Sequence, residues 1–199
     1  MSYKPVVVAL RRDPDIELEK QLDGILRPFM YDPALPWGQN SRCDEWSIGG
    51  RWAGHFLSVH RGASDLVNRL AFPPGAVLST HIACDGGPKG LLDLDFLRTR
   101  AEEEVWRRWP VRFHEREDDI LSGRDRPDAD PGKFHAATAA LVSQNRGRTL
   151  VGAALVTLEG EWIEGRGSWP ESEVCYGRID RYIEALDDDV WLVCLSVHF

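Results

Sequence analysis

A short segment in the first third of the chain gathers residue types that could bind a ligand or catalyse a reaction. It reads Trp46-Ser-Ile-Gly-Gly-Arg-Trp-Ala-Gly-His55-Phe. The adjacent Gly49 and Gly50 allow positive φ angles and the close approach of another group. Arg51 follows with a planar guanidinium suited to carboxylate or phosphate, and Trp46 and Trp52 flank the turn. The same residues would also fit a structural turn in which Arg51 is held in an internal ion pair.

His55 adds a group that could move a proton. A histidine acts as a general base when an acid orients it, and the preceding loop offers Asp44 or Glu45. Arg51 would then stabilise developing negative charge, which outlines a hydrolase for small molecules that carry a phosphate or a carboxylate. Asp44 and Glu45 are more typical of acids in a solvated loop than of catalytic groups.

A second cation and aromatic pair, Arg166 and Trp169, lies in a glycine-containing segment near the C-terminus. These two residues could converge with Arg51 and Trp52 on one ligand. The alternative is a cation–π pair that only stiffens the loop.

Metal binding and cofactors are not expected. His81 and Cys84 have a metal-like spacing that Cys43 and His55 could complete, but structural zinc sites bring their ligands closer together in sequence. The four cysteines are widely spaced without a CxxC pair, so we expect free thiols in a reducing compartment. The glycine-rich stretch around Lys89 does not match a Walker A motif and is interpreted as a turn that enters a helix.

Composition narrows the classes of partner. The chain has 199 residues, is 43% hydrophobic and carries a formal charge of −8. This charge argues against broad nucleic-acid or anionic-membrane binding but leaves room for a small anionic ligand. No apolar run reaches the roughly 18 residues of a membrane span. We therefore expect a cytoplasmic protein.

Hydrophobic periodicity and turn signals predict the elements. The predicted strands are 5–10, 52–60, 76–83, 150–158, 161–164 and 190–197, and the predicted helices are 14–27, 63–72, 93–109, 134–143 and 172–186. The chain would form a single domain of 199 residues, with a core from 1–60 and 149–199 and an insertion at 61–148. This core is interpreted on the βαββαβ plan, so the predicted fold is an α+β ferredoxin-like sandwich with a mixed insertion.

Two segments carry sharper predictions. Residues 117–132 are rich in Asp, Pro and Gly and should form an exposed loop that folding does not require. Residues 190–197 form a nearly continuous apolar run, which is typical of a central strand covered on both faces.

Four patches of the sequence resemble uncharacterised proteins of actinobacteria and their phages. They are Trp46-x-Ile48-Gly49-Gly50-Arg51-Trp52-x-Gly54, a first helix ending at Leu26-Arg-Pro-Phe29, Gly86-Gly-Pro-Lys-Gly-Leu-Leu-Asp93, and Ala154-Leu-Val-Thr-Leu-Glu-Gly-Glu-Trp162 with a terminal strand that ends in His198. The resemblance implies a shared architecture and no mechanism. Such proteins often end in Asp-Cys-His, whereas this chain has Ser196-Val197-His198, which argues against an acid–histidine role at the C-terminus.

Three functions follow from these residues. The first is a binding protein for a small anionic, nucleotide-like molecule, with a role in phage–host conflict suggested by the resemblance. The second is the hydrolase with His55 as general base. The third is a protein-interaction module without a ligand. The sequence leaves the oligomeric state open.

Overall fold

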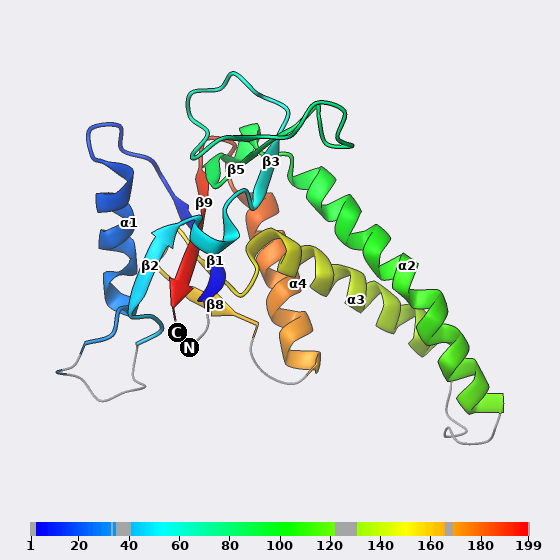
Figure 1. Cartoon of the computed structure of the whole chain (residues 1–199). Coiled ribbons are helices and arrows are strands. Elements are labelled where there is room, and N and C mark those ends of the chain that lie inside the picture. Colours follow the sequence, from blue (N-terminus) through cyan, green and yellow to red (C-terminus); the bar gives the residue numbers. More distant parts are fainter. Residues whose placement is uncertain (1–2, 33, 35–40, 122–130, 166–168, 199) are drawn as a thin grey trace.

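The computed structural model describes residues 3–32, 34, 41–121, 131–165 and 169–198 (Figure 1). Its strands are β1 (Tyr3–Leu10), β2 (Glu45–Ile48), β3 (Phe56–Ser58), β4 (Leu70–Ala71), β5 (Ile82–Cys84), β6 (Gly86–Pro88), β7 (Ala154–Val156), β8 (Trp162–Glu164) and β9 (Trp191–His198). Its α-helices are α1 (Leu18–Leu26), α2 (Leu94–Leu121), α3 (Pro131–Val151) and α4 (Trp169–Ala185), with short 3₁₀ turns η1 (Arg27–Phe29), η2 (Gly50–Trp52) and η3 (Lys89–Leu91). None of these described helices is long and apolar enough to cross a membrane.

The main sheet is built around β9. Its order is β2-β9-β1-β7-β8, and β6 shares with β2 the edge of β9 that faces away from β1. β1 and β7 run parallel, and the other pairs are antiparallel. β9 pairs with β1 along its whole length, from Tyr3 opposite His198 to Leu10 opposite Trp191. Its residues 192–197 are all buried, which confirms the prediction of a central, two-faced strand.

Each face of the main sheet is covered by a different layer. α1 packs on one face against side chains such as Val8 and Leu195. α4, the end of α3 and the small three-stranded sheet β3-β5-β4 cover the other face, where Val7 and Cys194 point. Side chains alternate along a strand, so β1 and β9 supply both cores at once. Figure 1 shows α1 and α4 on opposite sides of the sheet.

The α+β class is confirmed, but the ferredoxin-like topology is not. In that plan, the strand after the first helix would pair beside β7. Here β8, which follows β7 directly, occupies that position, and β2 lies at the opposite edge beside β9. The predicted strand 52–60 is shorter than expected, because β3 covers only Phe56–Ser58 and joins the separate small sheet.

The segment predicted as insertion differs most from expectation. The prediction of a helix over 63–72 is wrong. Val67 forms a backbone hydrogen bond with Gly86, and the segment ends in strand β4. Gly86 belongs to strand β6 and not to a helix-entry turn. A Cβ on Gly86 would overlap the carbonyl oxygen of Leu192, so glycine permits the close pairing of β6 with β9.

Two long helices project from the body as an antiparallel pair (Figure 1). α2 continues to Leu121, well past the predicted end at residue 109. The predicted loop 117–132 therefore begins inside a helix, and its residues 122–130 lie outside the described part of the chain. α3 ends at Val151, so the predicted strand 150–158 is reduced to β7. The helix stops at Gly152 (φ +70°), where a Cβ would overlap Pro5 of β1.

α1 begins at Leu18, four residues later than predicted. The carboxylate of Asp13 accepts a hydrogen bond from the Asp15 amide (3.0 Å), which closes a turn before the helix. Leu22 is fully buried against the sheet. Gly24 lowers helix stability by about 1 kcal/mol relative to Ala, yet a Cβ there would meet no atom within 4 Å.

Candidate functional site

The two glycines of the turn are fixed by packing. Gly49 and Gly50 have φ angles of +65° and +52°, which disfavour any residue with a Cβ. A Cβ on Gly49 would overlap the Asp85 carboxylate, and one on Gly50 would lie 2.6 Å from the Cβ of Ser196. The Gly49 amide donates to the Cys194 carbonyl (3.0 Å). The glycines therefore hold the turn against β9, and the Gly49 amide is already used inside the protein.

Asp85 is the buried acceptor on which this turn rests. It is 1% exposed and lies between β5 and β6. One carboxylate oxygen accepts from the Gly54 amide (2.6 Å), and the other accepts from the Asn68 side-chain amide (2.8 Å). A buried carboxylate is tolerated only when its oxygens are hydrogen-bonded. Asp85 therefore joins the segments of Gly54 and Asn68 to the end of β5, on the face of the sheet opposite α1.

Arg51 is an exposed cation that the turn presents at the surface. Its guanidinium carbon lies 5.0 Å from the ring centroid of Tyr3, and the residue forms no ion pair with the described residues. Two other arginines, in contrast, form ion pairs with carboxylates. Arg98 is paired with Asp180 (2.9 Å), and Arg146 is paired with Glu102 (2.5 Å). The alternative in which Arg51 is an internal ion-pair partner is therefore wrong for the described structure.

Tyr3, Asp44, Glu45, Arg51 and His198 form what we call the Tyr3 cluster. The Tyr3 hydroxyl donates to Glu45 (3.2 Å), and this bond is the main reason that the pKa of Tyr3 is raised. The Tyr3 and His198 rings lie 4.9 Å apart. Nδ1 of His198 is 2.6 Å from a carboxylate oxygen of Asp44. The cluster thus combines a cation, a phenol and an acid–histidine pair from β1, β2, η2 and β9.

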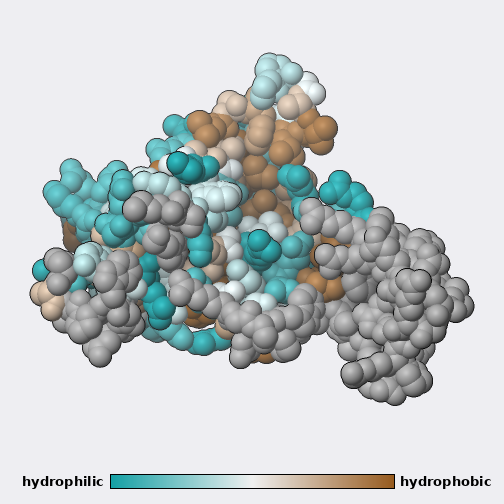
Figure 2. All heavy atoms as spheres, turned by 60° about the horizontal axis from the view of Figure 1, so that its bottom comes forward, coloured by the Kyte–Doolittle hydropathy of each residue, from teal (hydrophilic) through white to brown (hydrophobic). Residues whose placement is uncertain are grey.

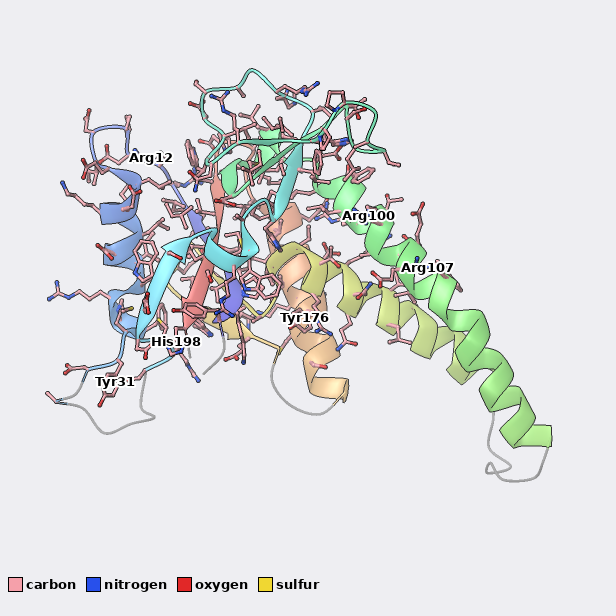
Figure 3. The ribbon with its side chains drawn as sticks, in the orientation of Figure 1. Arg12, Tyr31, Arg100, Arg107, Tyr176 and His198 are labelled. Atoms are coloured by element: carbon pink, nitrogen blue, oxygen red, sulfur yellow. The ribbon has the colours of Figure 1, made fainter. Side chains whose placement is uncertain are left out.

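Strand register explains why these residues meet. Tyr3 and Glu45 both lie opposite His198, on the two strands that flank the end of β9. Figure 3 shows His198 at that end of the sheet. Figure 2 views the molecule from the same end, and the described surface on its left side is largely hydrophilic.

His55 and Glu45, the predicted base and acid, have separate partners. Nε2 of His55 lies 2.8 Å from the Leu150 carbonyl, which requires Nε2 to carry a proton and to donate. Burial lowers the pKa of His55, while the bond to Leu150 and the charge of Asp85 oppose this shift. Glu45 accepts from Tyr3 instead. The carboxylate whose charge influences the pKa of His55 is Asp85, which the sequence did not indicate.

The aromatic residues of the predicted site divide between the two faces of the sheet. Trp46 packs with the α1 core, on the face opposite Glu45, because neighbours in β2 alternate. Trp52 follows Arg51 in η2 and is 42% exposed. Trp169 is the first residue of α4. Arg166 lies outside the described residues.

The residues considered for a zinc site either form hydrogen bonds within the protein or are buried thiols. His81 is buried, with Nε2 at 3.1 Å from Asp93 and Nδ1 at 3.0 Å from the Thr80 hydroxyl. Burial raises the pKa of the Cys43 and Cys84 thiols to about 11. Within the described ranges, no group of three or more His, Cys, Asp or Glu side chains could hold a metal ion. All four cysteines are free.

The Asp44–His198 pair is the part of the site that the sequence did not reveal. The terminal sequence Ser196-Val197-His198 offers no neighbouring acid, so the sequence alone argues against an acid–histidine role. The acid comes instead from Asp44, the residue before β2 and 154 residues away in the sequence. The contact between Asp44 and His198 can be predicted only when the pairing of β2 with β9 is known.

Comparisons with models of known protein families, with curated proteins and with solved structures find no match to this chain. The resemblance to actinobacterial and phage proteins stays a hypothesis.

Proposed function

We propose that the protein binds a small anionic, nucleotide-like molecule at the Tyr3 cluster, with Arg51 as the principal contact. The observation that carries this proposal is the state of Arg51, which is exposed, held over the Tyr3 ring and in no ion pair with the described residues. A guanidinium positioned in this way can accept a carboxylate or phosphate in a bidentate manner. The ordering of its side chain by Tyr3 reduces the entropy lost on binding.

The rest of the cluster fits the same ligand class. Trp52 is partly exposed beside Arg51 and could stack on an aromatic group. The cluster also contains two acids, which would repel an anion. Asp44 and Glu45 are, however, hydrogen-bonded to His198 and Tyr3, and this reduces the repulsion. Binding of a signalling nucleotide in phage–host conflict would be one use, in line with the resemblance.

A titration of ribonucleotides and small dicarboxylates by isothermal calorimetry tests the proposal. Arg51→Lys keeps the charge but removes the bidentate geometry, and it should weaken binding. Arg51→Ala should weaken it further, because a hydrogen bond to a charged group contributes about 1.5–3 kcal/mol. Arg61→Ala removes another exposed arginine and serves as the matched control. Equal losses in Arg51→Ala and Arg61→Ala would contradict a site at Arg51.

A hydrolase is the second candidate, and the Asp44–His198 pair favours it. If Nδ1–H of His198 donates to Asp44, Nε2 is left as a base that could take a proton from an attacking water. Arg51, which lies over the ring of Tyr3 in the same cluster, could stabilise negative charge on a phosphate or carboxyl ester. In this arrangement His198 and Asp44 take the roles that the sequence suggested for His55 and Glu45.

Turnover separates the two candidates. A hydrolase should convert aryl phosphate or aryl ester probes catalytically, and His198→Asn should abolish the conversion while leaving ligand affinity largely intact. A binding protein should show saturable binding without product. Absence of both, together with no small molecule retained in native mass spectrometry, would favour an interaction module without a ligand.

A further inference from the structure

A cavity of about 640 Å³ lies at the other end of the main sheet, remote from the Tyr3 cluster. It is lined by Ala9, Leu10, Arg11, Gly24, Ile25, Pro28, Thr157, Leu158, Glu159 and Gly160. These residues come from the end of β1, from α1 with η1, and from the turn between β7 and β8. Figure 3 shows Arg12 near this end and His198 near the opposite end.

Its place in the topology is one at which ligands commonly bind. β1 and β7 are adjacent and parallel, so their carboxyl ends meet at the same edge, and the chain leaves β1 to form α1. In open α/β sheets, ligands bind in the crevice outside the carboxyl ends of the parallel strands, and β1 and β7 form one such parallel pair here. A volume of this size lies within the usual range for small-molecule sites.

Gly24 is an independent indication that the space is kept open. It lies in the interior of α1, where glycine weakens a helix, and its φ is not in the left-handed region. A Cβ at this position would meet no protein atom within 4 Å. No contact within the described protein therefore requires glycine here, whereas any larger side chain would extend into the cavity.

The charges around the cavity favour a cation. Arg11 is already paired with Asp187 (2.8 Å) and lies 3.7 Å from Asp189. Glu159 accepts a hydrogen bond from the Tyr182 hydroxyl (3.0 Å) and pairs with no cation among the described residues. Hydrogen bonds from its own backbone amide, Thr157 and Tyr182 lower the pKa of Glu159, so this carboxylate is ionised at neutral pH.

We propose that this cavity binds a small molecule with an apolar body and a primary ammonium group. The ammonium group would pair with Glu159, and the apolar body would pack against Leu10, Ile25 and Leu158. This site is separate from the anion site at the Tyr3 cluster. The two ends are about 23 Å apart, because the eight residues of β1 are separated by seven steps of roughly 3.3 Å.

Three probes of nearly equal size test the charge preference: phenethylamine, phenethyl alcohol and phenylacetate. Heteronuclear NMR titration of the full chain should show amide shifts around α1 and the β7–β8 turn with the amine. The amine should bind about tenfold or more tightly than the alcohol, and phenylacetate should bind more weakly than the alcohol. Absence of amine binding at these residues, or equal affinity for phenylacetate, would overturn the proposal.

Two pairs of variants test the residues. Glu159→Gln should lower the affinity for phenethylamine to that of the alcohol, whereas Glu19→Gln on the exposed surface of α1 should not. Gly24→Leu should abolish binding of all three probes without lowering Tm, because leucine favours the helix and fills empty space. Asp23→Leu, one residue away and outside the cavity lining, is its control. Retained amine affinity in either Glu159→Gln or Gly24→Leu would refute the site.

A further measurement keeps this site distinct from the Tyr3 cluster. Arg51→Ala should leave phenethylamine binding unchanged. A parallel loss of amine binding in that variant would indicate that the amine occupies the Tyr3 cluster, which overturns the cavity assignment while leaving the anion proposal to its own test.

Discussion

The carboxylate of Asp85 occupies the space that a side chain at residue 49 would need. This relationship makes the Gly49–Gly50 turn part of the core, because Asp85 also binds the Gly54 amide and Asn68. The turn is thereby held rigidly beneath Arg51. The glycines are structural and the arginine is exposed, so the structural role belongs to the glycines and the proposed binding role to Arg51.

Gly49→Ala should therefore destabilise the protein strongly. It adds a Cβ at a φ of +65° and forces the Asp85 carboxylate out of its hydrogen bonds. Backbone strain of this kind costs about 1–3 kcal/mol, and the displaced buried carboxylate adds to it. Urea unfolding would measure the loss. Gly62→Ala is the matched control, since a Cβ there meets no atom within 4 Å. Similar stability for the two variants would argue against packing at Gly49.

Arg51→Ala should change the stability of the ligand-free protein little. The described contact of Arg51 is with the Tyr3 ring at an exposed position, and such a cation–π pair contributes about 0.5–1 kcal/mol. Removing a partner from a buried ion pair would instead cost roughly 3–5 kcal/mol. Thermal melts of the wild type and Arg51→Ala would show which of these two losses in the free energy of unfolding occurs. A loss in the larger range would mean that Arg51 supports the fold.

Val193→Asp should prevent the accumulation of soluble folded protein. Val193 is fully buried in the centre of β9, in the core beneath α1, where an unpaired carboxylate has no partner. The matched control is Val59→Asp, because Val59 is 51% exposed just after β3. Soluble yield and circular dichroism would compare the two. Normal yield of Val193→Asp would contradict a central position for this strand.

His55 should make stability fall as the pH is lowered. Burial lowers its pKa in the folded state below the ordinary value near 6.5, so the unfolded chain binds the proton more readily. The contribution is fully present above about pH 6.5 and is lost as the pH falls towards the folded pKa. Urea unfolding at several pH values should show a smaller slope in this window for His55→Gln than for wild type. His60→Gln, at an exposed position, should retain the wild-type slope.

The sequence predicted the parts of the fold that depend on composition alone. The apolar runs of β1 and β9 identified the two central strands, because burial on both faces demands apolar residues throughout. It did not predict β4 and β6, because two- and three-residue strands carry too little periodicity. The sequence suggests a turn at Gly86, whereas in the structure this glycine lets β6 approach the backbone of Leu192 closely.

The candidate site was predicted only in part, for a different reason. Arg51 and its glycines could be found because they are neighbours in sequence. Tyr3, Asp44 and His198 come together through the pairing of β1, β9 and β2, which no local pattern encodes. The sequence also gives no sign of the alternation that places Trp46 on the other face, since it predicts a loop at Glu45 and a turn at Trp46 where the structure has β2.

The register that places Tyr3 opposite His198 also brings the start of β1 and the end of β9 together, and Figure 1 shows these two strands side by side. A polypeptide that extends from the start of β1 or from the end of β9 therefore begins beside Tyr3 and the acid–histidine pair. An affinity tag or fluorescent fusion at a terminus would therefore crowd the same surface that a ligand would use. Ligand screens should use protein from which the tag has been cleaved, or carry the label on the far side of the molecule.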